Sequence, residues 1–168
     1  KQLMVSIADW VFDDRTPEWA PRLGNMWRTQ SDIDYRVYEE VNGQYVYNSS
    51  KSVPVSWNLI MRNFIGNDVP PVAGPGHWND PDYLLIGGYG LSPTEEQSYF
   101  NMWIIQSAPL ILATYPADLS AQTAEGQRLR NLLLNKEAIA INQDALGRQG
   151  EKVREDWPGI LVYGKALS

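Results

Sequence analysis

Residues 92–113 read SPTEEQSYFNMWIIQSAPLILA and hold the clearest pair of helix and strand signals in the chain. Ser92 and Glu95 have the spacing of a capping box, and Pro93 occupies the first helical position. Large apolar side chains then recur every three to four residues until Pro109, which ends the helix. The apolar run at 110–113 has the composition of a short buried strand. We therefore predict a helix that leads directly into a strand.

The same alternation of strand and helix signals extends along most of the chain. Residues 16–21 have the composition of a turn or a short helical start. Further elements are expected as strands at 3–7, 24–27, 70–73 and 110–113, and as helices at 54–64, from 92 onward and at about 124–134. Strands that alternate with helices are typical of a parallel sheet with helical crossovers. The sequence therefore predicts an α/β fold.

Two segments depart from this alternation and are predicted to be hairpins. Asn42-Gly43 is a strong hairpin turn signal, and it lies in the middle of a surface excursion over residues 34–51. From Val153 onward the pattern changes again, and residues 157–164 have the composition of strands in an antiparallel unit.

Composition excludes several classes of function. The chain has 168 residues, of which 43% are hydrophobic and 20% charged, so we expect one ordinary domain with a real core. The net charge of −6, without a cluster of basic residues, argues against a nucleic-acid partner. The apolar runs are too short to cross a membrane. Cys is absent and His77 is the single histidine, so we predict neither a metal site nor a cofactor.

Aromatic residues are abundant, with seven Trp and nine Tyr. Such side chains stack on the apolar faces of sugar rings, but they also fill cores and interfaces. Composition alone leaves both interpretations open.

Polar and turn-forming residues gather where the predicted strands end. They are Asp9 and Trp10 after the first strand, Arg28 and Asp32 after the second, and Trp78, Asp80 and Asp82 after the third. In parallel α/β folds the carboxyl ends of the strands form the edge that carries function. We therefore expect these residues to share one rim.

Carboxylates beside aromatic residues suit glycoside hydrolysis. That reaction needs one carboxyl to protonate the leaving oxygen and a second to attack the anomeric carbon or to activate water. An arginine beside a carboxylate can hold sugar hydroxyls or lower the pKa of that carboxylate. Two alternatives remain open from the residues alone. Arg28 and Asp32 can be a structural ion pair, and several Asp residues can bind a hard cation, although they lack the spacing of a calcium loop.

Four longer motifs point to one family. They are MWRTQSDID at 26–34, VAGPGHWNDPDYLLIG at 72–87, SPTEEQSYFNMWIIQSAPLIL at 92–112 and LLNKEAIAINQDALGRQG at 133–150. In this order they resemble glycoside hydrolase family 27. This is the α-galactosidase (melibiase) family of retaining (β/α)8-barrel enzymes.

The resemblance implies roles for individual residues. Asp32 matches the general acid/base, and Arg28 matches the arginine that contacts substrate and the catalytic pair. The other matching positions are Asp9 and Trp10 beside the 2-position of the sugar, Asp82 and Tyr83 in the sugar pocket, and Trp78 and Asp80 as support for that loop.

Three residues depart from the family pattern. Ala8 stands where Cys is frequent, Tyr83 where Met is frequent, and His77 where Gly is usual. Because Ala8 and Tyr83 fall on the pocket wall, the sugar stays open. Terminal α-galactosyl groups are the first expectation. The alternatives are the α-N-acetylgalactosaminidase, β-L-arabinopyranosidase and isomalto-dextranase specificities, or a non-catalytic carbohydrate-binding relative.

The resemblance also implies that the chain is part of a longer protein. Residues 1–150 match the C-terminal half of the barrel, about strands five to eight, and residues 151–168 match the beginning of a C-terminal β-sandwich domain. The aspartate nucleophile of the fourth strand would then lie upstream, so we expect the isolated chain to be inactive. The implied partner is a carbohydrate, and the family favours a secreted or extracytoplasmic location.

Overall fold

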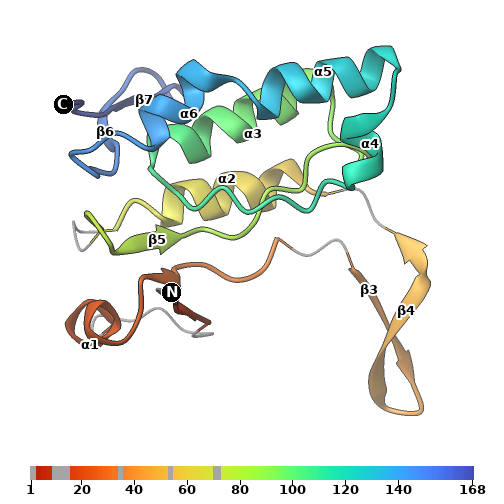
Figure 1. The fold of residues 1–168 in the computed structure, drawn as a ribbon. Coiled ribbons are helices and arrows are strands. Elements are labelled where there is room, and N and C mark those ends of the chain that lie inside the picture. The colour runs from red at the N-terminus through yellow and green to blue at the C-terminus, as the bar shows by residue number, and fades with distance from the viewer. Residues whose placement is uncertain (1–2, 9–15, 34–35, 53–54, 70–72) are drawn as a thin grey trace.

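The computed structural model describes residues 3–8, 16–33, 36–52, 55–69 and 73–168 (Figure 1). The helices are α1 (Thr16–Leu23), α2 (Trp57–Gly66), α3 (Pro93–Ile105), α4 (Pro116–Ser120), α5 (Ala124–Leu133) and α6 (Lys136–Asn142). The strands are β1 (Ser6–Ile7), β2 (Met26–Arg28), β3 (Arg36–Val41), β4 (Gln44–Ser52), β5 (Trp78–Asp80), β6 (Glu151–Glu155) and β7 (Leu161–Gly164). The predicted mixture of helices and parallel strands is confirmed.

A parallel sheet in the order β1-β2-β5 forms the framework of the molecule. Met26 pairs with Trp78 and Arg28 pairs with Asp80, so β2 and β5 end at the same level. Outside these strands, Leu84 and Leu112 form an isolated bridge that is also parallel. Because parallel neighbours need crossover connections, α1 links β1 to β2, and α2 lies in the connection from β2 to β5.

Two of the predicted strands differ from the structure. The third strand is β5, not 70–73, of which residues 70–72 lie outside the described part of the chain. Residues 74–77, which include Pro75, form a tight turn, closed by a bridge between Gly74 and His77 and with Gly76 at φ 84°. They therefore mark where the strand begins. Residues 110–113 form the single bridge at Leu112 rather than a full strand.

The core lies between the helices and the segment that follows β5. The capping box of α3 is present, with reciprocal hydrogen bonds between Ser92 and Glu95. Tyr99 and Trp103 of this helix are fully buried, and their rings meet edge to face at 4.5 Å. Other fully buried members of this core are Ile33, Ile60, Leu84, Leu85 and Ile86. For Tyr99 and Trp103, the interpretation of aromatic residues as core is correct.

Both segments predicted to be antiparallel contain a hairpin, although the second hairpin begins at β6, before the predicted residues 157–164. β3 and β4 pair in antiparallel fashion around Asn42 and Gly43, both at positive φ as a tight hairpin turn requires. This hairpin stands apart from the rest of the molecule, beyond the ends of β2 and β5 (Figure 1). β6 and β7 form the second hairpin, and the Tyr163 ring lies 4.5 Å from the Phe64 ring of α2. Within the described ranges, none of the helices has both the length and the apolar character needed to cross a bilayer.

Candidate active site

The candidate site lies where two neighbouring strands end. β2 ends at Arg28 and β5 ends at Asp80, and these two residues are partners in the sheet. The loops that follow, 29–33 and 81–83, therefore leave the sheet side by side at its carboxyl edge. Parallel α/β folds place their functional residues at this edge.

The guanidinium group of Arg28 joins the two loops. Its Nη1 lies 2.9 Å from a carboxylate oxygen of Asp32, and its Nη2 lies 3.1 Å from one of Asp82. The Nη2 group also donates to the carbonyl of Gln30 at 3.0 Å. The side chain of Asp82 is 1% exposed and that of Asp32 is 33% exposed. The same arginine thus holds one buried carboxylate and one that is accessible from solvent.

The carboxylate of Asp82 is held from several sides. It accepts backbone N–H groups from Ile33 at 2.6 Å and from Tyr83 at 2.8 Å. The carbonyl of Asp82 accepts the indole N–H of Trp103 at 2.7 Å. Its φ of 103° is unusual for a residue with a side chain. Such strain persists where the surroundings over-determine the backbone, and it is typical of functional sites.

Asp80 supports the same loop. Its carboxylate accepts the N–H of Asp82 at 2.9 Å, and its carbonyl accepts the N–H of Thr29 at 3.0 Å. Burial raises the pKa of Asp80, although the hydrogen bond from Asp82 and the charge of Arg28 oppose the shift. Burial likewise raises the pKa of Asp82, against the opposing hydrogen bond from Ile33 and the charge of Arg28. Both acids are therefore more easily protonated than ordinary aspartates.

The remaining predicted residues fall in different places. Asp9 and Trp10 lie outside the described residues. Tyr83 is half-buried, and its carbonyl accepts the hydroxyl of Tyr99 at 2.7 Å. Trp78 does not share the rim, because it is the first residue of β5 and lies at the other end of the strand.

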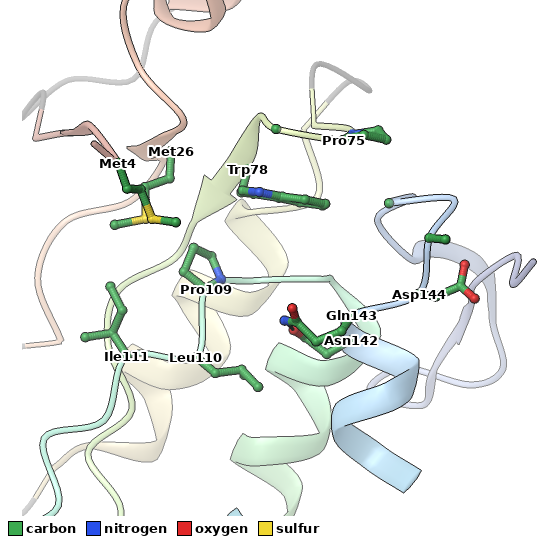
Figure 2. A pocket seen from close by; sticks show the side chains of 13 residues that line it. Met4, Met26, Pro75, Trp78, Pro109, Leu110, Ile111, Asn142, Gln143 and Asp144 are labelled. Carbon is green, nitrogen blue, oxygen red and sulfur yellow. Dashed lines mark hydrogen bonds between the residues drawn. The ribbon is translucent and has the colours of Figure 1, made fainter. Parts of the chain in front are cut away.

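At that other end lies an apolar hollow of about 520 Å³ (Figure 2). Met26 at the start of β2 and Trp78 at the start of β5 line it, with Met4, Pro109 and Ile111. Alternation along a strand places Met26 and Arg28 on the same face of β2, and Trp78 and Asp80 on the same face of β5. The hollow and the candidate site therefore occupy opposite ends of one face of the sheet.

A buried chain of amides crosses the other face. Trp27 donates to the side chain of Asn79 at 2.9 Å, and Asn79 donates to Gln149 at 3.0 Å. Gln149 in turn donates to the carbonyl of Asn67 at 2.7 Å. Gln149, the penultimate residue of the motif at 133–150, therefore connects β5 to the end of α2.

Sequence reasoning missed Asn63 of α2. Its side-chain amide donates to the carbonyl of Ser31 at 2.9 Å and to that of Pro81 at 2.7 Å, so it contacts both loops of the site. A signal was available, because Asn63 falls on the apolar face that Ile60 and Phe64 define. A polar side chain on a buried face needs partners there.

Across the part of the chain that the structure describes, no three His, Asp or Glu side chains are grouped to hold a metal ion. The site is instead a set of paired charges in which Arg28 is central. Its Nε atom is buried and has no hydrogen-bond partner among the described residues.

Comparison with known proteins identifies the family. Residues 18–144 match the family model described as alpha galactosidase A. The chain belongs to the alpha-galactosidase A family. The alpha-galactosidase of Oryza sativa subsp. japonica is 35% identical over 100% of this chain and 34% of its own length. The Homo sapiens alpha-N-acetylgalactosaminidase is 44% identical over 58% of this chain and 22% of its own length.

Solved structures of alpha-galactosidases share the fold. Alpha-galactosidase I from Mortierella vinacea matches with a TM-score of 0.71 at 22% identity, over 99% of this chain and 40% of that structure. The Saccharomyces cerevisiae alpha-galactosidase with raffinose matches with a TM-score of 0.65 at 22% identity, over 95% and 34%. The chain spans about a third of the length of its curated relatives from Oryza sativa and Cyamopsis tetragonoloba.

Proposed function

We propose that this chain carries the acid/base half of the active site of a retaining exo-α-glycosidase that removes terminal α-galactosyl groups. The observation that carries the proposal is the bridge from Arg28 to the accessible Asp32 and the buried Asp82. Glycoside hydrolysis requires one carboxyl that can reach the glycosidic oxygen and fixed polar groups that hold the sugar. Asp32 fits the first requirement, and the buried Asp82 fixes Arg28 beside it.

In this mechanism Asp32 acts twice. In the first step it donates its proton to the leaving oxygen, while an aspartate supplied from outside this chain attacks the anomeric carbon. A covalent glycosyl–enzyme forms and the aglycone leaves. In the second step the Asp32 carboxylate takes a proton from water, which attacks the anomeric carbon and releases the sugar. Two inversions give net retention.

Arg28 orients the acids and offers a further donor. Its two terminal nitrogens hold Asp32 and Asp82 at 2.9 and 3.1 Å, which limits the positions that Asp32 can adopt. A buried donor without an acceptor is costly, typically about 1–3 kcal/mol. The Nε of Arg28 is such a donor.

We further infer that residues 1–150 form about strands five to eight of a (β/α)8 barrel. The parallel order β1-β2-β5 and the bridge at Leu84 support this. Met4, which lines the hollow of Figure 2, is 72% exposed, and its neighbour Leu3 is 83% exposed. An apolar edge of this kind requires a covering partner. The remaining barrel strands would cover it. The hairpin of β6 and β7 would begin a C-terminal β-domain over residues 151–168.

Galactose is favoured as the terminal sugar. The relatives that match nearly the whole chain, from Oryza sativa and Cyamopsis tetragonoloba, are alpha-galactosidases. We propose that Tyr83, which is half-buried and follows Asp82 directly, helps to shape the pocket wall that selects the sugar.

The proposal is tested with Asp32→Ala in the complete protein. We expect kcat/KM for methyl α-galactoside to fall by about 10²–10⁴, because its alkoxide is a poor leaving group and needs the proton. The kcat/KM for nitrophenyl α-galactoside should fall much less, because nitrophenolate leaves without protonation. The control is Asp118→Ala, an exposed acid of α4.

Equal slowing of both substrates would contradict the acid/base role. The 168-residue chain alone is a second control, and we expect no hydrolysis from it. Turnover by this chain above that of its own Asp32→Asn variant would show that it contains a complete site.

A further inference from the structure

Asn63 contacts both loops of the candidate site from behind. It lies on α2 with 0% of its surface exposed, between the core residues Ile60 and Phe64. Its side-chain nitrogen donates to the carbonyl of Ser31 at 2.9 Å and to the carbonyl of Pro81 at 2.7 Å. Ser31 immediately precedes the proposed acid/base, and Pro81 immediately precedes the sealed acid of the pocket.

The chemistry of the partners determines how the amide is oriented. Both neighbours of its nitrogen are carbonyl oxygens, which only accept. Its oxygen accepts from Arg62, from Nε at 3.0 Å and from Nη2 at 2.9 Å. Arg62 only donates. A flipped amide would therefore place its oxygen against two carbonyl oxygens and its NH₂ group against the N–H groups of Arg62. The amide has one orientation that satisfies all four contacts.

Among the described residues, no other side chain donates to the carbonyls of both Ser31 and Pro81. Ile33 and Asp82 connect the loops two residues further along the first loop and one further along the second, through the 2.6 Å hydrogen bond to the carboxylate of Asp82. Arg62 also reaches the carbonyls of Ser31 and Asp32 at 3.3 Å. Asn63 is the part of this arrangement that reaches the backbone before each acid.

We infer that Asn63 is a positioning residue that sets where Asp32 stands relative to Asp82 and hence to the bound sugar. The inference rests on the proposed function, because it presupposes that Asp32 delivers a proton there. Proton transfer depends steeply on the distance between donor and acceptor, and a misplacement of about 1 Å can cost roughly a hundredfold in rate. The competing view is that Asn63 only stabilises the fold.

The test uses Asn63→Leu in the complete protein, which keeps the volume of the side chain and removes its donors. We expect kcat/KM for methyl α-galactoside to fall roughly 10- to 100-fold. The kcat/KM for nitrophenyl α-galactoside, which does not need the proton, should fall less than about threefold. The matched control is Asn58→Leu, the same change at an exposed position of the same helix.

Asn63→Ser is the second variant, because it fits the site and keeps one hydroxyl donor. We expect it to recover part of the loss on methyl α-galactoside. Equal losses on the two substrates in both variants would leave the ratio of their kcat/KM values unchanged. That result would show a purely structural role and overturn the inference.

The wild-type protein separates this inference from the proposed function. Hydrolysis of nitrophenyl α-galactoside by the wild type tests the proposed function by itself. A wild type that hydrolyses neither substrate contradicts both proposals. An active wild type whose substrate preference survives Asn63→Leu contradicts the role of Asn63 alone.

Discussion

A carboxylate oxygen of Asp82 accepts a 2.6 Å hydrogen bond from the backbone N–H of Ile33, a residue 49 positions earlier in the chain. This bond joins the loop after β2 to the loop after β5. It is one of several contacts on Asp82, which has φ 103°, a conformation that residues with a Cβ rarely adopt. The contacts that form the site therefore surround its most strained backbone position.

We expect Asp82→Gly to be less damaging to stability than Asp82→Ala. Both variants lose the buried carboxylate and its contact with Arg28, which should cost about 3 kcal/mol. Glycine adopts positive φ without penalty, whereas alanine keeps the strain of about 1 kcal/mol. Thermal midpoints of the complete protein would measure the difference. A lower midpoint for Asp82→Gly than for Asp82→Ala would contradict the assignment of strain to this residue.

We expect Asp80→Asn to stabilise the protein increasingly as pH rises from about 4 towards neutrality. Burial raises the pKa of Asp80 above its ordinary value of 3.8. Below that value the acid is protonated in both the folded and the unfolded state. As pH rises from about 3.8 to the raised folded pKa, the unfolded state ionises first and folding loses stability, and above the folded pKa the loss levels off. Asparagine avoids this loss and keeps an oxygen for the N–H of Asp82.

Thermal midpoints of Asp80→Asn and wild type over this pH range would check the prediction. Asp118→Asn, on the exposed surface of α4, is the control. If the advantage of Asp80→Asn shrank as pH rose, burial would not be the dominant influence on this carboxyl.

We expect Glu96→Ala to cost about 2 kcal/mol of stability and Glu125→Ala less than about 1 kcal/mol. Both acids pair with Arg128, but Glu96 is 2% exposed and Glu125 is 58% exposed. Glu96 also accepts the N–H of Gly87 at 2.7 Å, which its removal leaves without that partner. Thermal midpoints of the two variants would test this. Equal losses would mean that burial does not decide the value of this ion pair.

Local signals in the sequence predicted the elements that short-range rules control. The capping box of Ser92 and Glu95, the Asn42-Gly43 turn and the alternation of strands and helices are all present in the structure. Each of these depends on residues within about four positions of one another. The helix α6 was missed because seven residues carry little periodicity, and short helices depend on tertiary packing for their stability.

The sequence motifs indicated the family and nominated Arg28, Asp32 and Asp82 as site residues. They misplaced Trp78, because a glycine- and proline-rich stretch does not reveal whether it precedes or follows a strand. They also passed over Asn63, whose importance depends on two carbonyls, 32 and 18 positions away in the chain.

By itself, the sequence determined the α/β class, the family and the chemical character of the site, because periodicity, turn residues and motifs act over short spans. Only the tertiary structure decided that the carboxylate of Asp32 is accessible and that the carboxylate of Asp82 is buried. That difference arises because the register of β2 against β5 brings Arg28 between Asp32 and Asp82, and because Asn63 reaches both loops from the core. Contacts of that range depend on how the elements pack, which no local pattern encodes.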